Sequence, residues 1–367
     1  MFGGSWPVSG AGARNRLQFA LGSVLAGLVS LVFLLWMVLV VGGPRMTDLV
    51  DDIGELVAAV IAAALCALAA SRASSRRTSW ILLAVSSFAW AVGEAIWCYY
   101  DLVERVQVPF PSYADIGFVT AIPFMFAGLL LFPCNSRRTA ARIEGLLDGC
   151  IIAGSLLFAS WATILGPIYR SHSGGVLKQV LSLTYPASDV VMLSLVLILI
   201  ARAGHHRRTA FGLVMFGVVA FAVADSSFAY LTEVNKFGIG SYFDTGWVAG
   251  YLLIALGALW DVKSPARAVV RADPSTTSLI APYVPVLIVL VVTAVQILRG
   301  SHVDAVTWVM AVVLVVLVLG REGLRLRDQA VDFRSRSSHA SPHPISSSHA
   351  GPGPDPGRDR DSALVER

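Results

Sequence analysis

Two apolar segments and the turn between them decide the fold: Gly93-Glu94-Ala95-Ile96-Trp97-Cys98-Tyr99-Tyr100 and, after a short polar loop, Pro109-Phe110-Pro111-Ser112-Tyr113-Ala114-Asp115-Ile116-Gly117. One acid lies inside the first segment and another lies at the edge of the second. An ionised side chain inside a membrane span costs about 2.5–3.5 kcal/mol on insertion scales, so each acid needs a compensating contact. We therefore expect a membrane-embedded helical hairpin with polar contacts at its two acids.

The composition places the rest of the chain in a bilayer as well. Hydrophobic residues make up 56% of the 367 residues, charged residues only 14%, and the mean hydropathy is +0.69. Soluble domains contain about 25% charged residues. The net charge of +4 is not read as affinity for nucleic acid, because basic residues in a membrane protein first report its orientation.

Ten apolar runs are predicted to cross the membrane as helices of about 20 residues each. They are residues 17–41, 53–70, 80–100, 113–133, 143–165, 183–202, 210–231, 243–260, 280–298 and 305–320. The first run is too long for the apolar part of a cleaved signal peptide, and no Ala-x-Ala site follows it. The predicted fold is all-α and polytopic.

The basic residues predict the orientation of these spans. Of the 28 Lys and Arg residues, 22 fall at the termini and in alternate loops, and 6 fall in the other loops. This bias predicts that both termini are cytoplasmic and that the protein lies in the cell membrane. The predicted parts are a short cytoplasmic N-terminus (1–16), a transmembrane module (17–320), a basic connector helix (321–334) and a disordered cytoplasmic tail (335–367).

The spans read as repeated helical hairpins. Ser112-Tyr113-Ala114-Asp115 resembles Ser241-Tyr242-Phe243-Asp244, which predicts duplication of an up-down helical pair. An acid at the outer side marks the start of each even-numbered span, and these acids are Asp52, Asp115, Asp189, Asp244 and Asp304.

Two interpretations of the outer acids stay open together. Ser-x-x-Asp is typical of a capping box, in which the Ser oxygen and the acid each accept a free backbone N–H at a helix start. Capping is expected for Asp115, Asp244 and Asp304, and Asp52-x-x-Glu55 fits the same device. In the second interpretation, several of these carboxylates converge around an outward-facing cup that binds a cation or a polar ligand.

Three further acids lie inside apolar runs, where capping does not explain them. Glu94 shares one helical face with Trp90 and Trp97, which are spaced i, i+4, i+7, and Asp225 lies in the outer third of its span. Asp148 lies near Arg142 and is interpreted as a satisfied charge at the cytoplasmic interface. The candidate ligand-binding residues are Glu94, Trp90, Trp97, Asp115, Asp225 and Asp244. The alternative is that Glu94 and Asp225 form structural hydrogen bonds between helices.

No motif for catalysis or for a metal is recognisable. The four cysteines form no CxxC pair, and His205-His206 has no further ligands at zinc-binding spacing. No Ser-His-Asp or Cys-His arrangement can be argued. We predict no catalytic residue, no metal and no cofactor, and no enzyme activity.

The block from Ala91 to Pro133 resembles part of the multi-pass N-terminal membrane module of bacterial, especially actinobacterial, GGDEF/EAL signalling proteins. The resemblance implies a sensory module coupled to cytoplasmic cyclic-di-GMP synthesis or breakdown, with a basic connector that begins at Arg321. This chain has no Gly-Gly-Asp-Glu-Phe or Glu-Ala-Leu motif, so neither cyclase nor phosphodiesterase activity carries over.

The leading hypothesis is a non-enzymatic membrane sensor that binds an unknown small ligand on the outer side. It would signal to a cytoplasmic protein through Arg321–Arg336. A secondary transporter that uses intramembrane carboxylates is the first alternative. A decayed fragment of a membrane-bound diguanylate cyclase or phosphodiesterase is the second. A further hypothesis is a membrane-embedded enzyme that acts on a lipid, and only the acids inside the apolar runs support it.

Overall fold

The computed structural model describes residues 10–73, 76–132, 139–171, 175–202, 205–233, 236, 238, 240–263, 283–298 and 304–339. Every regular element in these residues is helical, which confirms the all-α prediction. Eight of the described helices are long and apolar enough to cross a membrane. The cytoplasmic placement of both termini stays a prediction.

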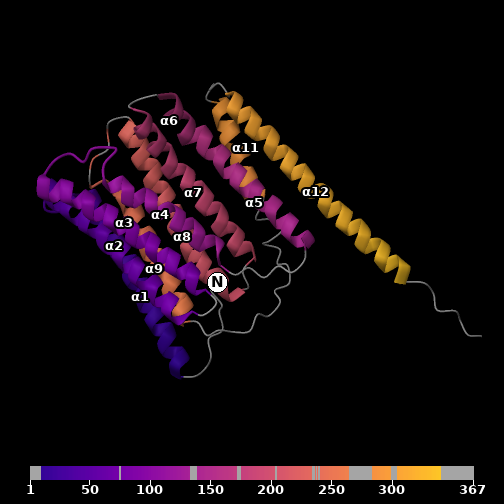
Figure 1. Cartoon of the computed structure of the whole chain (residues 1–367), viewed down its shortest axis with the longest axis horizontal. Helices are drawn as coiled ribbons and strands as arrows, with labels where there is room; N and C mark the ends of the chain where they lie inside the picture. The colour runs from indigo at the N-terminus through magenta and orange to yellow at the C-terminus, as the bar shows by residue number, and fades with distance from the viewer. Residues whose placement is uncertain are drawn as a thin grey trace, which may run out of the picture. The chain divides into compact units, whose positions relative to one another are not determined.

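The helices are α1 (Gly10–Leu39), α2 (Pro44–Arg72), α3 (Arg77–Cys98), α4 (Ala114–Leu130), α5 (Thr139–Ser160), α6 (Gly166–Ser171), α7 (Val176–Arg202), α8 (His205–Glu233), α9 (Thr245–Lys263), α11 (Tyr283–Leu298) and α12 (Ala305–His339) (Figure 1). The π-helical turn η1 (Tyr99–Glu104) extends α3, and the π-helical turn η2 (Trp161–Leu165) joins α5 to α6. The 3₁₀ turn η3 (Tyr242–Asp244) precedes α9. Helices α4 and α11, with 17 and 16 residues, are shorter than the eight spans.

The early starts of α2 and α7, relative to the predicted spans, move three acids into helix interiors. Gly42 and Gly43 have φ of 82° and 86°, a left-handed backbone that favours glycine, and Pro44 then starts α2 at a position where proline is well tolerated. The prediction that Asp52 and Glu55 form a capping box is therefore wrong. Helix α7 starts at Val176, so the prediction that Asp189 marks a helix start is also wrong.

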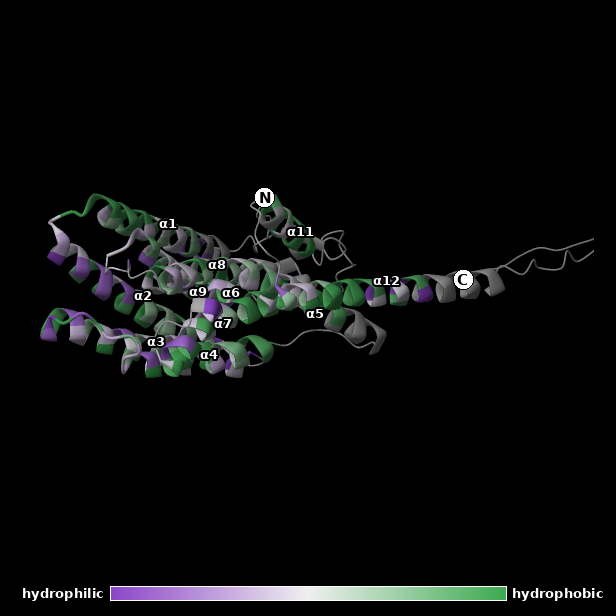
Figure 2. Cartoon of the chain, turned by 90° about the horizontal axis from the view of Figure 1, so that it is seen from above, coloured by the Kyte–Doolittle hydropathy of each residue, from purple (hydrophilic) through white to green (hydrophobic). Residues whose placement is uncertain are grey.

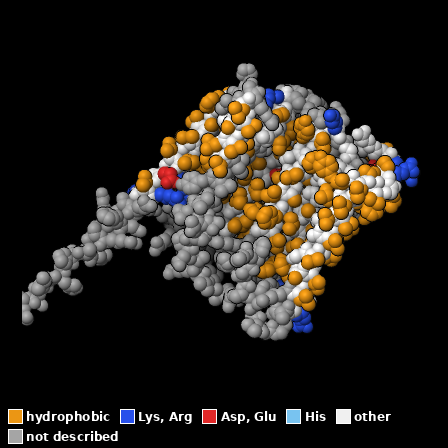
Figure 3. All heavy atoms as spheres, turned by 180° about the vertical axis from the view of Figure 1, so that it is seen from behind, with side chains coloured by type: hydrophobic (Ala, Val, Ile, Leu, Met, Phe, Trp, Pro, Cys, Tyr) orange, Lys and Arg blue, Asp and Glu red, His pale blue; other side chains and the backbone are white. Residues whose placement is uncertain are grey.

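The outer surface is apolar, as expected for helices in lipid. Many large apolar side chains of α1 are exposed, including Leu17 at 60% and Val24 at 68%, and the same holds for α12. Figure 3 shows apolar side chains spread over the described surface, with Lys and Arg at its edges. In Figure 2, hydrophilic positions gather on α2 and α3, whereas α12 is mostly hydrophobic over its first part. The fold is that of an integral membrane protein.

Glycines let the helices of the Glu94–Gly117 hairpin pack backbone to backbone. A Cβ on Gly117 would lie 2.5 Å from the backbone nitrogen of Gly93 and 2.7 Å from the carbonyl oxygen of Ala89. Helix α9 meets α8 in the same way, because a Cβ on Gly246 would lie 2.6 Å from the carbonyl oxygen of Ala220. Small residues at such contacts are typical of helix packing in membranes.

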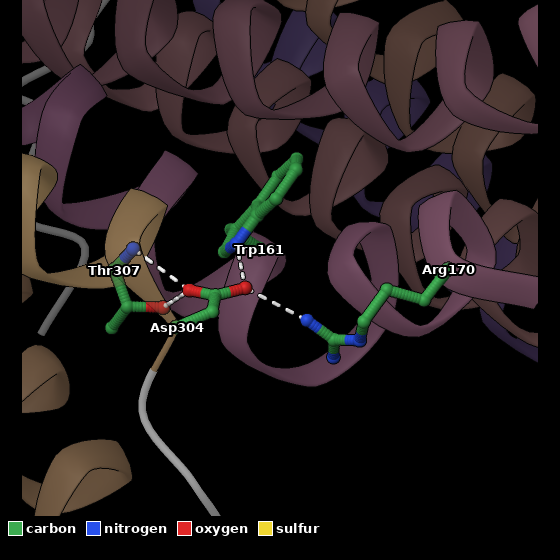
Figure 4. A network of polar contacts seen from close by, with 4 residues as sticks. All are labelled: Trp161, Arg170, Asp304 and Thr307. Carbon is green, nitrogen blue, oxygen red and sulfur yellow. Dashed lines mark hydrogen bonds and ion pairs between the residues drawn. The ribbon is translucent and has the colours of Figure 1, made fainter.

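A polar network holds the start of α12 (Figure 4). Asp304 accepts hydrogen bonds from the Thr307 backbone N–H (2.9 Å), from the Trp161 indole (3.2 Å) and from Arg170 (2.7 Å). Desolvation raises the pKa of Asp304, but these contacts outweigh it and hold that pKa below its usual value. The capping role predicted for Asp304 is confirmed, with Thr307 as the donor; Ser301 lies outside the described residues.

Asp148 is paired, as predicted, but its recorded partner is Arg321 of α12. Arg321 is only 1% exposed. The side chain of Arg142 lies outside the described residues. Residues Met1–Arg321 form one compact unit and Glu322–Arg367 another. The predicted connector, residues 321–334, lies within α12, and the tail beyond His339 lies outside the described residues.

Candidate functional site

A small cavity lies among α2, α3, α4, α7, α8 and α9. The volume accessible to the centre of a water molecule is about 50 Å³. The residues that line the cavity are Asp51, Asp52, Glu55, Trp90, Glu94, Trp97, Asp115, Phe118, Tyr185, Asp225, Phe228, Asp244 and Trp247. Its walls are therefore carboxyl groups and aromatic rings.

All six residues predicted from the sequence as ligand-binding lie around this one cavity. They are Trp90, Glu94, Trp97, Asp115, Asp225 and Asp244. Each of the four acids among them is at most 7% exposed. The structure thus brings together residues from four helical elements, and binding of a ligand to them stays a prediction.

Asp115 combines capping with a contact between helices. Its Oδ2 accepts the Ser112 backbone N–H at 2.7 Å, as the predicted capping box requires. Its Oδ1 accepts the phenolic O–H of Tyr185, from α7, at 2.5 Å. Both carboxyl oxygens of this buried group therefore have a donor.

Asp244 is fixed by the predicted capping box at the start of η3. Its Oδ2 accepts the Ser241 backbone N–H at 2.7 Å, and the Ser241 hydroxyl accepts the Phe243 N–H at 3.4 Å. Asp51 of α2 lies beside it, with one oxygen accepting the Gly240 N–H at 2.6 Å. The Asp51 and Asp244 carboxyls are in contact with each other.

The two mid-helix acids each accept a hydrogen bond from an indole N–H. Trp90 donates to Glu94 at 3.0 Å within α3, and Trp247 of α9 donates to Asp225 of α8 at 2.6 Å. Each acid also contacts a second carboxyl group, Glu55 for Glu94 and Asp189 for Asp225. The structural alternative, hydrogen bonds between helices, describes the Trp247–Asp225 contact, and it extends to the two carboxyl pairs when one member of each pair is protonated.

The cavity is built from two similar halves, α2–α4 (the first half) and α7–α9 (the second half). Trp90-Ala91-Val92-Gly93-Glu94 of α3 matches Phe221-Ala222-Val223-Ala224-Asp225 of α8. The equivalent pairs are Trp90 and Phe221, Glu94 and Asp225, Trp97 and Phe228, Ser112 and Ser241, Asp115 and Asp244, Gly117 and Gly246, and Phe118 and Trp247.

Equivalent aromatic residues of the two halves contact each other beside the cavity. Trp90 and Phe221 are stacked with ring centroids 6.3 Å apart and an interplanar angle of 15°, and the Trp97 and Phe228 centroids are 6.5 Å apart. Contact between equivalent residues is the arrangement that a pseudo-twofold axis between α3 and α8 produces, and we interpret the two halves in this way.

Sequence reasoning did not select Asp51, Glu55, Tyr185 and Trp247 for the site, and it included Asp52 and Asp189 only among the outer acids that could converge around a cup. The α2 acids were assigned to a helix start because the apolar run begins only at Ile53. If Gly42-Gly43-Pro44 is taken as the helix start, Asp51, Asp52 and Glu55 lie about two to three turns inside the helix. Tyr185 and Asp115 are 70 residues apart in the sequence, and no local sequence pattern predicts their contact.

Negative charge in this site has no basic partner among the lining residues. Seven carboxyl groups line the cavity, and no Lys, Arg or His does. Burying carboxylates without partners is strongly unfavourable, so protons or a bound cation must neutralise most of them. The lining residues therefore have the chemistry to bind a cation, and they include no Lys, Arg or His side chain to bind an anion.

Comparison with protein-family models, with curated proteins and with solved structures returned no match.

Replacing Tyr185 with Phe tests the contact to Asp115. The loss of one donor to a buried carboxyl group should destabilise the protein by about 1–3 kcal/mol, measured by thermal unfolding in detergent. Tyr113→Phe is the matched control, because Tyr113 is 70% exposed and its loss of a hydroxyl should change little. Equal stability of the two variants would contradict the assigned hydrogen bond.

Proposed function

We propose that the chain is a multi-pass membrane sensor whose cavity binds a small cation and whose state is passed to a cytoplasmic partner through α12. The observation that carries the proposal is the convergence of seven buried carboxyl groups and three tryptophans on one cavity without a basic side chain. A cation would neutralise the carboxylates, and the aromatic faces would add a cation–π attraction.

The size of the cavity selects the class of ligand. One water molecule needs about 10–15 Å³ of volume accessible to its centre, so the cavity of about 50 Å³ has room for roughly three or four. An inorganic cation with part of its water shell, or a small amine, fits this space. A larger organic headgroup needs the two halves to move apart.

The route toward the cytoplasmic side is supported by contacts outside the cavity. Helix α7, which carries Tyr185, packs against α5. Helix α5 in turn holds α12 through the Asp148–Arg321 ion pair. Helix α12 continues to His339 through a basic stretch, as expected from the resemblance to sensory modules of cyclic-di-GMP signalling proteins.

Cation-dependent thermal unfolding of the purified full-length protein tests the proposal. Sodium, potassium, methylammonium, magnesium and calcium chlorides at equal ionic strength should include at least one cation that raises the Tm of the wild type. A cation at 100 times its Kd stabilises the folded state by about 2.7 kcal/mol. That shift should be lost in Glu94→Gln and Asp225→Asn.

Glu104→Gln is the matched control, because Glu104 is an exposed acid at the end of η1 and does not line the cavity. It should keep the full cation effect. The proposal fails if no cation stabilises the wild type, or if the effect survives in both cavity variants.

Transport of the cation is the second candidate function. Two similar halves around a polar site are typical of many secondary transporters. Cation flux into proteoliposomes that Glu94→Gln abolishes would identify a transporter. Binding without flux would support the sensor.

A further inference from the structure

We propose that Asp51, Glu55 and Asp244 form a site for a hard divalent cation, of which Ca²⁺ is the best fit. The inference rests on the proposed function, because it names the class of cation and the part of the cavity that holds it. Asp51 and Glu55 come from α2 of the first half, and Asp244 comes from η3, which leads into α9 of the second half.

The distances among the three carboxyl groups fit one coordination shell. One oxygen of each group lies within 4.8 Å of the others, and all three residues are buried. Calcium binds oxygen at about 2.3–2.6 Å, so two ligands on opposite sides of the ion lie roughly 4.8 Å apart. All three oxygens can therefore bind one ion without movement of the backbone.

Two buried carboxyl oxygens in this part of the cavity have no recorded hydrogen-bond partner. Asp51 is 4% exposed, and its Oδ1 has no hydrogen-bond partner among the described residues. The Oδ2 of the neighbouring Asp52, which also lines the cavity, likewise has none among them. Buried polar atoms are almost always satisfied, so a proton, a water molecule or a bound cation has to meet these two oxygens.

The second half also has a buried oxygen without a recorded partner, Oδ2 of Asp189, but the two halves differ at one pair of equivalent positions. Glu55 and Asp189 are equivalent, since each contacts the mid-helix acid of its own half. One helical turn earlier stand Asp51 in α2 and Tyr185 in α7. Each reaches across to the helix-start aspartate of the other half, Asp244 and Asp115 respectively.

The chemistry at these two equivalent places is opposite. Tyr185 supplies an O–H donor to Asp115, which completes that contact within the protein. Asp51 supplies a second carboxyl group to Asp244, so a donor exists between them only when one of the two groups is protonated. A cation between Asp51 and Asp244 would take the place that the tyrosine hydroxyl proton takes in the second half.

Backbone contacts hold the candidate ligands in place. The Gly240 N–H fixes one oxygen of Asp51, and the Ser241 N–H fixes one oxygen of Asp244. Each carboxyl group keeps its other oxygen for a ligand. Such supporting contacts orient ligand side chains in protein metal sites.

The donor set decides which ions fit. The three acids offer only carboxyl oxygens as ligands, and no His or Cys lines the cavity. Oxygen-only sites prefer calcium, magnesium and manganese, whereas zinc prefers nitrogen and sulfur ligands. Calcium accepts several carboxylates in a flexible shell, whereas magnesium demands a small octahedral shell and keeps most of its water.

Terbium luminescence tests this site directly in the purified full-length protein. Tb³⁺ replaces Ca²⁺ at oxygen sites, and Trp90 and Trp247 line the same cavity and can sensitise its emission. We expect sensitised emission from the wild type that calcium chloride displaces and sodium chloride at equal ionic strength does not. Asp51→Asn, which removes one carboxylate at nearly constant shape, should weaken Tb³⁺ binding at least about 10-fold.

Asp51→Tyr is the second variant. It places in the first half the residue that the second half uses, so it should abolish Tb³⁺ binding while the protein still elutes as a folded species in size-exclusion chromatography. Glu104→Gln should bind Tb³⁺ as the wild type does. Absence of displaceable emission from the wild type, or emission that persists unchanged in Asp51→Asn, overturns the proposal.

The outcomes also separate this inference from the proposed function. If sodium, potassium or methylammonium stabilises the wild type and Glu94→Gln removes the effect, but Tb³⁺ and Ca²⁺ do not bind, the divalent site alone is wrong. If no cation of any class has an effect, both proposals fail.

Discussion

Gly117→Ala is expected to destabilise the protein by at least about 3 kcal/mol, at the upper end of the cost of overpacking a core. The added Cβ would lie 2.5 Å from the Gly93 nitrogen and 2.7 Å from the Ala89 carbonyl oxygen. Both neighbours are backbone atoms of α3, which cannot rotate away as a side chain would. Helices α3 and α4 would have to separate, and thermal unfolding in detergent should show a much lower Tm.

Gly212→Ala is the matched control, because a Cβ there would meet nothing within 4 Å. It lies within α8, where alanine is favoured over glycine by about 0.5–1 kcal/mol, so this variant should be as stable as the wild type or more so. Gly246→Ala should behave like Gly117→Ala, since its Cβ would lie 2.6 Å from the Ala220 carbonyl oxygen. A Gly117→Ala protein with an unchanged Tm would show that the α3–α4 contact is looser than described.

Arg321→Met is expected to cost about 2–3 kcal/mol, less than the roughly 3–5 kcal/mol lost when one partner of a fully buried ion pair is removed. Arg321 is 1% exposed and is bound to Asp148, whose side chain is 28% exposed. Without Arg321, water would compensate the charge of Asp148 only in part. Unfolding of the purified protein, followed by tryptophan fluorescence, measures the loss.

Two further variants separate the ion pair from a general effect on α12. The double variant Arg321→Met/Asp148→Asn should recover much of the lost stability, because the orphaned charge is removed as well. Arg325→Met, one turn further along α12, removes only a 3.8 Å contact to Glu322 and should change stability by no more than about 0.5 kcal/mol. Additive losses in the double variant would argue against a direct pair.

The sequence predicted the class of fold well and the helix starts less well. Long apolar runs define membrane helices strongly, so most spans were located near their observed positions. The start of α2 was missed because three acids precede its apolar run, and polarity was given more weight than the Gly42-Gly43-Pro44 turn. Because the start of α2 was missed, Asp51 and Glu55 were not among the predicted site residues.

The predicted site residues were found because an acid inside an apolar run is conspicuous. Glu94 and Asp225 stand out in this way, and Asp115 and Asp244 stand out through their shared Ser-Tyr-x-Asp pattern. The partners that these acids use across the bundle could not be predicted, because contacts such as Tyr185 to Asp115 depend on how the two halves dock. Local sequence patterns identify acids within one half of the bundle, whereas the cavity forms only where the two halves pack together.

The close glycine contacts at Gly117 and Gly246 have a mechanical consequence. They tie α3 to α4 and α8 to α9 through backbone atoms, so each hairpin should move as a rigid block. The contacts between α3 and α8 are instead made by aromatic side chains, Trp90 with Phe221 and Trp97 with Phe228, which can slide or turn. Any widening of the cavity would then be a hinge motion of one hairpin against the other, in which the aromatic rings between α3 and α8 slide past each other.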